Sequence, residues 1–231
     1  MIADLIRKFH MKKSKGTTLV EMVVSFALLG IFVSASAVVI SNVTNLYYRV
    51  RGESYARQVG DIVVNKVASE ISGAMYDEVN TGLNPYITDD FEEDTNISVD
   101  GNVITLYNRS QTGISIFADD GILNVYYHKI EGYKNAEEEK NRQAVNWNFD
   151  KKMYNGYAIK SLEFVPANST ENDTLAAAYG ITDVNHADYP ANVVAVYMRL
   201  ESDRYGSFNI CRFVKIYDAP ENMKWAGTTN P

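Results

Sequence analysis

The residues that could perform catalysis or bind a metal are few in this sequence. It contains three histidines, at His10, His128 and His186, and a single cysteine, Cys211. One thiol cannot form an intrachain disulfide, and it cannot supply the two or more cysteines of a cysteine-based zinc or iron–sulfur site. The Gly-x-Ser-x-Gly, His-Glu-x-x-His and Gly-x-x-x-x-Gly-Lys motifs do not occur. We therefore expect no catalytic residues, no enzymatic activity and no bound cofactor.

Two places in the sequence offer ligands of the types that metals prefer. His186 has Asp183 and Asp188 nearby, which together could bind a metal ion, although a solvated loop is the favoured interpretation. An acidic run could offer oxygen ligands to calcium but lacks the alternating acidic positions and the turn glycine of a dedicated calcium loop; it contains Asp89, Asp90, Glu92, Glu93 and Asp94. We predict a solvated acidic loop there and no bound metal.

Charge is distributed unevenly along the chain. The formal net charge is −7, but residues 1–16 contain five basic residues against one acidic residue, so the remainder is more acidic still. An acidic bulk is a poor nucleic-acid binder. A weak basic group in the C-terminal strands is nearly cancelled by neighbouring carboxylates; its members are Arg199, Arg204, Arg212, Lys215 and Lys224. The sequence thus carries no strong nucleic-acid signal.

A long uncharged segment follows the basic N-terminus. No charged residue occurs between Glu21 and Arg49, and residues 22–43 are almost entirely apolar. About 20 apolar residues suffice for a helix to cross a bilayer. The basic residues before the segment predict, by the positive-inside rule, a cytoplasmic N-terminus and an exported C-terminal bulk. We therefore expect a single membrane span.

Three interpretations of this segment compete. Ala35, Ser36 and Ala37 resemble the cleavage site of an ordinary signal peptide, but the apolar run starts far upstream and continues past them. A permanent single-span anchor explains the length and the basic flank but gives Glu21 no role. A carboxylate at the edge of an apolar helix needs a partner, because a charge is costly in lipid.

The third interpretation takes the junction KGTTLVE, residues 15–21, together with the apolar run that follows. This junction resembles the type IV prepilin signature, in which a short basic leader ends in glycine and glutamate is the fifth residue of the mature helix. The resemblance implies that prepilin peptidase cuts after Gly16 and methylates the new N-terminus at Thr17, and that Glu21 acts in assembly. The family usually has Phe where this chain has Thr17. Met11 is an alternative start that gives a shorter leader.

The first element that we expect to position these residues is a long helix. Beyond the apolar run, Val59, Ile62, Val63, Val67 and Ile71 recur at spacings of three and four, which indicates one apolar helix face. No proline precedes Pro85, so a single helix over residues 17–75 is predicted. Gly52 and Gly60 are expected to be tolerated surface glycines, with a bend at either as the alternative.

Strands and turns follow the helix. Two hairpins are predicted, residues 97–107 around Asp100 and Gly101, and residues 113–130 around Asp119, Asp120 and Gly121. Further strands are expected at residues 158–165, 193–200 and 210–217. His128, in the second hairpin, and the strand tyrosines are expected to serve packing, and Cys211 is expected to be a buried apolar residue. Residues 131–152 and 166–191 are predicted to be loops or short helices. The fold class is therefore α+β, a long, partly transmembrane N-terminal helix packed on a mainly antiparallel sheet, like a pilin.

The predicted organisation has four parts: a leader (1–16), an assembly and transmembrane half of the helix (17–45), an amphipathic half (46–75) and an extracytoplasmic β-rich domain (76–231). The resemblance implies a structural subunit, minor pilin or pseudopilin, of a pilus, secretion or competence filament. Its implied partners are prepilin peptidase, other pilin or pseudopilin subunits, the inner-membrane assembly platform and membrane lipid. The alternative is a single-span anchored extracytoplasmic binding protein, in which Glu21 is incidental.

Overall fold

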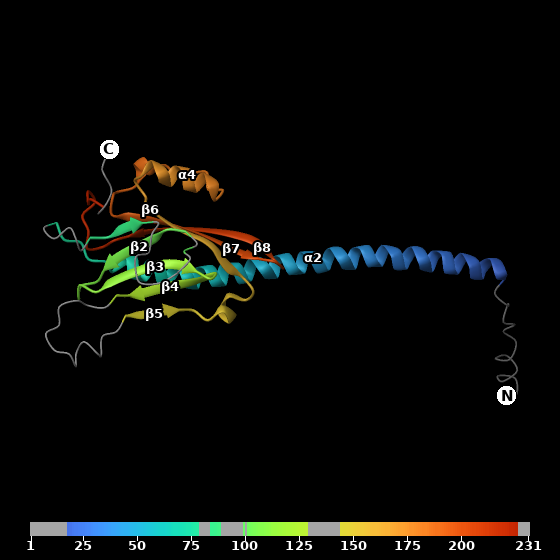
Figure 1. Ribbon diagram of the computed structural model, residues 1–231. Helices are drawn as coiled ribbons and strands as arrows, with labels where there is room; N and C mark the ends of the chain where they lie inside the picture. Colours follow the sequence, from blue (N-terminus) through green and yellow to red (C-terminus); the bar gives the residue numbers. More distant parts are fainter. Residues whose placement is uncertain (1–17, 79–83, 89–98, 100, 129–143, 226–231) are drawn as a thin grey trace, which may run out of the picture. The chain divides into compact units, whose positions relative to one another are not determined.

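The computed structural model describes residues 18–78, 84–88, 99, 101–128 and 144–225 (Figure 1). The chain divides into two compact units, Met1–Tyr48 and Arg49–Pro231. Helix α2, Leu19–Ser72, runs without interruption for 54 residues and contributes to both units. The predicted single helix is confirmed, although it ends at Ser72 rather than at Met75.

Within the second unit, one face of α2 is buried. The buried positions follow helical spacing; they are Gly52, Ala56, Val59, Gly60, Val63, Val64, Val67 and Ile71. All of them except the two glycines belong to the main hydrophobic core. Ile62, which the apolar pattern included, is instead 49% exposed. The predicted helical spacing of the apolar face is therefore confirmed, but the inclusion of Ile62 in that face is wrong.

Gly52 and Gly60 are buried contacts, not surface glycines. A Cβ on Gly52 would lie 2.7 Å from Cβ of Tyr205, and a Cβ on Gly60 would overlap with Cδ1 of Ile210. Both positions lie inside α2. Close approach of strand side chains to the helix backbone therefore explains these glycines, and the expectation of solvent-facing glycines is wrong.

The first sheet has five strands, β1 (Tyr86–Thr88), β2 (Val103–Tyr107), β3 (Gly113–Asp119), β4 (Ile122–Tyr127) and β5 (Val145–Asn148). They are paired in that order, and every pair is antiparallel. Asp120 and Gly121 join β3 to β4 with φ angles of 49° and 75°. Two successive positive φ angles are typical of the tight turn that matches strand twist. The hairpin predicted over residues 113–130 is thus confirmed over residues 113–127, and residues 129–130 lie outside the described part of the chain.

The other predicted hairpin is wrong in its pairing. Val99 forms a bridge with Asp119, and β2 pairs with β1 and β3 instead. The side chain of Asn102 explains the difference, because its amide donates to the carbonyl of Phe164 (2.7 Å) and its oxygen accepts from the Phe164 N–H (2.6 Å). The chain at Gly101 and Asn102 therefore docks on a later strand rather than folding back on itself.

The second sheet has three antiparallel strands, β6 (Ala158–Pro166), β7 (Val193–Ser202) and β8 (Gly206–Lys215), in that order. Alternate residues of β7 face opposite sides: Val194, Val196 and Met198 belong to the core that includes α2, whereas Ala195 and Tyr197 belong to a smaller cluster beneath helix α4, Thr170–Ala178. The sheet is thus covered on both faces. Two short 3-10 helices, η2 (Lys151–Tyr154) and η3 (His186–Asp188), complete the fold.

These elements confirm an α+β protein with a long N-terminal helix and antiparallel sheets. The predicted strands at residues 158–165, 193–200 and 210–217 are all present with shifted ends. Strand β5 and helix η2 lie in a segment predicted as loop or short helix, and β1 was not predicted at all. Residues 129–143 lie outside the described part of the chain.

Candidate functional site

The start of α2 is held by a reciprocal pair of side chains. Thr18 immediately precedes the helix, and its Oγ1 accepts a hydrogen bond from the Glu21 N–H (3.3 Å). The Glu21 carboxylate in turn accepts from the Thr18 N–H (2.9 Å) and from its hydroxyl (3.2 Å). This is a capping box, which satisfies N–H groups that a helix start otherwise leaves without partners. Glu21 thus has a local partner within its own chain.

Sequence reasoning identified Glu21 but not Thr18. The signal was present, because threonine followed three residues later by glutamate, ahead of an apolar run, is the sequence signature of a capping box. The other two predicted site residues, Gly16 and Thr17, lie outside the described part of the chain, as do the leader with His10 and the acidic run at residues 89–94.

The first unit presents apolar side chains to its surroundings. Its large apolar residues from Leu19 to Leu46 are at least half exposed, and α2 is long and apolar enough to cross a membrane by length and composition. The two hydroxyls in its middle are satisfied inside the helix, because Oγ of Ser34 donates to the Gly30 carbonyl and Oγ of Ser36 to the Phe32 carbonyl, each at 2.8 Å. Such back-bonding lets serine sit in an apolar environment without an unpaired polar group.

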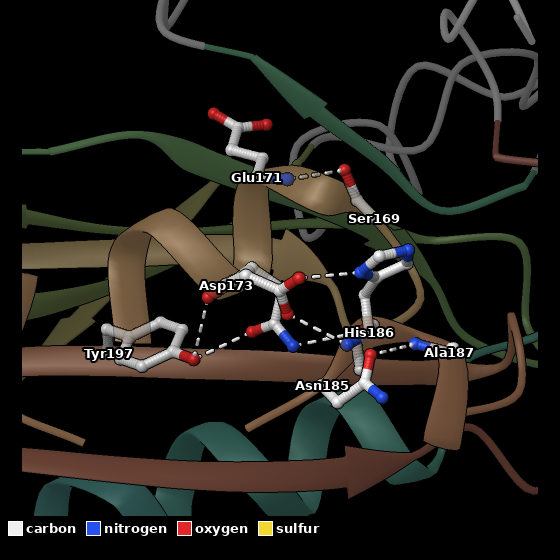
Figure 2. Close-up of polar contacts among 9 residues, drawn as sticks. Ser169, Glu171, Asp173, Asn185, His186, Ala187 and Tyr197 are labelled. Carbon is white, nitrogen blue, oxygen red and sulfur yellow. Dashed lines mark hydrogen bonds and ion pairs between the residues drawn. The ribbon is translucent and has the colours of Figure 1, made fainter. Parts of the chain in front are cut away.

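A second polar constellation lies between α4 and η3, and Figure 2 shows its members. His186 Nδ1 is 2.6 Å from Oδ2 of Asp173, and the His186 N–H donates to Oδ1 of Asp173 (2.8 Å). The hydrogen bond from the His186 side chain lowers the pKa of Asp173. The partner of His186 is therefore Asp173 on α4, not the sequence neighbours Asp183 and Asp188. Among the described residues no group of three potential metal ligands occurs.

Nearby contacts in the same view are structural. Asn185 begins η3 by accepting a hydrogen bond from the Ala187 N–H (3.2 Å), and the buried Tyr197 hydroxyl donates to Oδ1 of Asn172 (2.7 Å) (Figure 2). Asn172 also donates to the Ala167 carbonyl (2.9 Å). The bond between Tyr197 and Asn172 fastens α4 to β7.

His128 takes part in a hydrogen-bonded row across the first sheet. Its Nε2 is 2.7 Å from Oγ of Ser115, which is 2.8 Å from Oγ1 of Thr105. Ser115 is buried, with 1% of its surface exposed, so a substrate carbonyl could not reach its hydroxyl. The interpretation of His128 as a packing residue fits this geometry.

Cys211 lies in β8 and is half-buried, so it is less buried than expected. Desolvation raises the pKa of its thiol to about 11, while a hydrogen bond with the Tyr197 hydroxyl opposes this effect. A thiol in that state is protonated at neutral pH, and the thiolate is the reactive form. Cys211 therefore serves packing and not covalent chemistry.

Side-chain contacts within the fold involve Arg199, Arg212 and Lys215 of the C-terminal basic group. Arg199 lies over the Tyr179 ring (5.0 Å) and donates to Oδ1 of Asn209 (3.0 Å), and Arg212 donates to Oδ1 of Asn65. Lys215 pairs with Glu221 at 3.2 Å. Their guanidinium and ammonium groups thus have partners within the chain.

Comparison with protein families identifies the start of the chain. Residues 11–37 match the family described as the prokaryotic N-terminal methylation motif. No curated protein and no solved structure matches the chain. The matched segment contains the capping box and more than half of the exposed apolar segment described above. Residues 11–37 are therefore a prokaryotic N-terminal methylation motif, the prepilin motif of type IV pilins.

Proposed function

We propose that this protein is a structural subunit, minor pilin or pseudopilin, of a type IV pilus or a related secretion or competence filament. The observation that carries the proposal is the methylation motif at residues 11–37, which includes the start of α2 and more than half of its exposed apolar segment. The motif and the apolar helix indicate a membrane-anchored, pilin-like protein. An apolar surface of this length needs lipid or other helices around it.

In the proposed maturation, prepilin peptidase cleaves after Gly16 on the cytoplasmic side and methylates the new amine of Thr17. Residues 17–45 remain in the membrane, and the β-rich residues 76–231 lie outside it. The basic leader supports this orientation through the positive-inside rule. The chain acts as a structural part and not as an enzyme, in keeping with the family that carries this motif.

In the proposed assembly, the apolar helices of neighbouring subunits pack together at an inner-membrane assembly platform. A carboxylate among apolar helices is tolerated when it is paired, and the amine created by cleavage is a suitable counter-charge. This pairing is the role that we propose for Glu21, which lies in the first turn of α2 and accepts hydrogen bonds from Thr18.

The proposal is tested by the intact mass and N-terminal peptides of the protein extracted from native membranes. A chain that starts at Thr17, with or without one methyl group, supports the proposal. A chain that retains Met1 or Met11 contradicts it and favours the permanent anchor, and a soluble chain that starts at Val38 indicates an ordinary signal peptide.

The substitution Gly16→Trp provides a direct check of cleavage. We expect it to block processing in cells that contain prepilin peptidase, so that the variant keeps its leader and migrates more slowly than the mature protein on a gel. The matched control is Gly30→Ala, because nothing lies within 4 Å of a Cβ at Gly30 and the residue is far from the junction. Equal mobility of Gly16→Trp and the processed wild-type chain would exclude the assigned cleavage site.

A further inference from the structure

A surface hollow of about 280 Å³ lies in the second unit, between α2 and the strands β6 and β8. It is lined by Arg49, Glu53, Tyr157, Tyr205, Ser207 and Phe208. The tyrosine wall is fixed by packing, because the rings of Tyr157 and Tyr205 stack at 5.9 Å and the Tyr157 hydroxyl donates to the Gly52 carbonyl at 3.0 Å. The tyrosine side of the hollow is therefore set by the packing of the fold.

The hollow offers hydrogen-bond donors that the fold does not use. The Arg49 guanidinium and the Ser207 hydroxyl, both exposed, make no hydrogen bond or ion pair with any residue in the described part of the chain. Glu53 is the acidic group of the lining. Its carboxylate is 2.7 Å from the Arg57 guanidinium, and the side-chain hydrogen bond from Arg57, followed by the charges of Arg57 and Arg49, lowers the pKa of Glu53.

Cationic and anionic groups are balanced around the hollow. Arg49 and Glu53 are one helical turn apart on α2, and Glu201 lies opposite Ser207 in the pairing of β7 with β8. The Arg204 guanidinium lies over the Tyr205 ring at 5.5 Å. A purely anionic ligand would meet these carboxylates, whereas a zwitterion can place its phosphate on the arginine and its ammonium on the carboxylate.

This step rests on the membrane span of the proposed function. The position of Arg49 relative to that span indicates where such a ligand lies. Arg49 comes six positions after Val43, the end of the apolar run, which corresponds to about 9 Å along a helix. The headgroup layer of a bilayer extends roughly 5–8 Å beyond the hydrocarbon on each side. An arginine side chain and interfacial tyrosines reach this layer from that position.

We propose that this hollow binds the zwitterionic headgroup of a phosphoethanolamine lipid in the outer leaflet of the membrane. The phosphate accepts hydrogen bonds from Arg49 and Ser207, the ammonium pairs with Glu53, and the tyrosine rings contact the glycerol and ethanolamine carbons. The contact fixes the protein at the membrane surface before assembly.

The experiment uses the full-length chain in nanodiscs that contain phosphatidylcholine with equal shares of phosphatidylethanolamine and phosphatidylglycerol. After transfer to detergent, native mass spectrometry counts the lipids that each protein retains. We expect the wild type to retain phosphatidylethanolamine in preference to the other two lipids. Arg49→Gln should lower its retention roughly tenfold, the effect of losing one charge-assisted contact. Glu53→Gln should remove the preference for phosphatidylethanolamine over phosphatidylglycerol.

Arg109→Gln and Glu171→Gln are matched controls, because they remove the same charges from exposed side chains outside the hollow. Equal retention in Arg49→Gln and Arg109→Gln overturns the proposal, as does equal retention of the three lipids or a preference for phosphatidylglycerol. Soluble phosphoethanolamine, added at millimolar concentration to protein without lipid, tests the other source of the same group. If the protein forms an adduct with soluble phosphoethanolamine but retains no phosphatidylethanolamine, the proposal that the ligand is a membrane lipid is overturned.

This result is separable from that of the proposed function. A chain that is processed at Gly16 but shows no lipid preference contradicts only the headgroup site. A chain that keeps its leader but retains phosphatidylethanolamine through Arg49 contradicts only the pilin-like function.

Discussion

Glu21 combines two possible roles that substitutions can separate. Its carboxylate accepts hydrogen bonds from Thr18 in the capping box, and the proposed assembly also gives its negative charge a neighbour's amine. Glutamine can replace glutamate in a capping box but carries no charge. We therefore expect Glu21→Ala and Glu21→Gln both to be cleaved normally and both to enter filaments poorly, measured as the fraction of processed subunit in sheared filaments.

Thr18→Ala is the matched variant, because it removes the cap and keeps the charge. We expect its filament fraction to exceed that of either Glu21 variant. Normal entry of Glu21→Gln into filaments would show that Glu21 contributes the cap and not the charge.

Gly60 is the position where the helix backbone leaves no space for a side chain. A Cβ there would overlap with Cδ1 of Ile210 on β8. Overpacking of a core typically costs about 1–3 kcal/mol. Alanine inside a helix is favoured over glycine by about 0.5–1 kcal/mol, which offsets part of this cost. We expect Gly60→Ala to lower the free energy of unfolding by about 1–2 kcal/mol, measured by denaturant titration of the full chain in detergent.

Two companion variants make the test of Gly60 specific. Gly73→Ala has ordinary space, with its nearest atom 3.5 Å away, and should change stability by less than about 0.5 kcal/mol. Ile210→Val removes the overlapping methyl group and should recover part of the loss when combined with Gly60→Ala. Additive losses in the double variant would contradict the overlap.

At the scale of elements, Asp173 and His186 fasten η3 to α4. Hydrogen bonding with His186 places the pKa of Asp173 in the folded state below its ordinary value of 3.8. A carboxyl whose pKa is lower in the folded state than in the unfolded state stabilises the fold at pH values above its pKa in the unfolded state. This stabilisation is lost as the pH falls through its pKa in the folded state. The contribution is therefore complete at neutral pH and is lost only below about pH 3.8.

Asp173→Asn should loosen this attachment at neutral pH. We expect faster amide hydrogen exchange in residues 184–189 with little change in β7, because the bonds of Asn172 to the sheet remain. Asp183→Asn and Asp188→Asn are matched controls, since His186 bonds to neither residue. Equal exchange in all three variants would show that the contact with Asp173 does not hold η3 in place.

The helix and the hairpin could be predicted because their signals are local. Apolar period and the absence of proline predicted α2, and Asp120 with Gly121 predicted the turn between β3 and β4. The pairing of Asn102 with Phe164 could not be predicted, because it joins residues 62 positions apart and resembles an ordinary turn signal in the sequence. The short strands β1 and β5 lack an alternating pattern long enough to detect.

The same distinction applies to the site. Gly16, Thr17 and Glu21 could be assigned roles because a contiguous motif contains them, and Thr18 had a readable cap signal. The hollow had no such signal, because Arg49, Tyr157 and Ser207 come together only when α2, β6 and β8 pack. The contact between His186 and Asp173 could not be predicted for the same reason, because Asp173 lies 13 positions earlier in the sequence, on helix α4.

At the scale of the whole molecule, one core joins the two ends of the second unit. Trp225 is 8% exposed, belongs to the same cluster as Ala56 and Val63, and donates from Nε1 to the Ala191 carbonyl at 3.0 Å. Truncation of a buried tryptophan costs roughly 3–5 kcal/mol. We expect Trp225→Ala to lower the free energy of unfolding by about 3 kcal/mol, measured by denaturant titration of the full chain in detergent.

The matched control is Tyr217→Ala, because Tyr217 is 78% exposed. Its effect should stay within about 0.5 kcal/mol, as for most surface substitutions. A loss as large as that of Trp225→Ala would show that the C-terminal segment is held by contacts other than the core.

A core built from the first and last parts of the second unit also constrains when the protein can fold. The chain is synthesised from its N-terminus, so residues 52–71 of α2 emerge early, whereas two of their core partners, Met223 and Trp225, emerge about 150 residues later. Contacts between residues this far apart form late and slow the folding reaction. The core therefore stays incomplete until residue 225 has been synthesised, and this is the interval in which a chaperone would be needed.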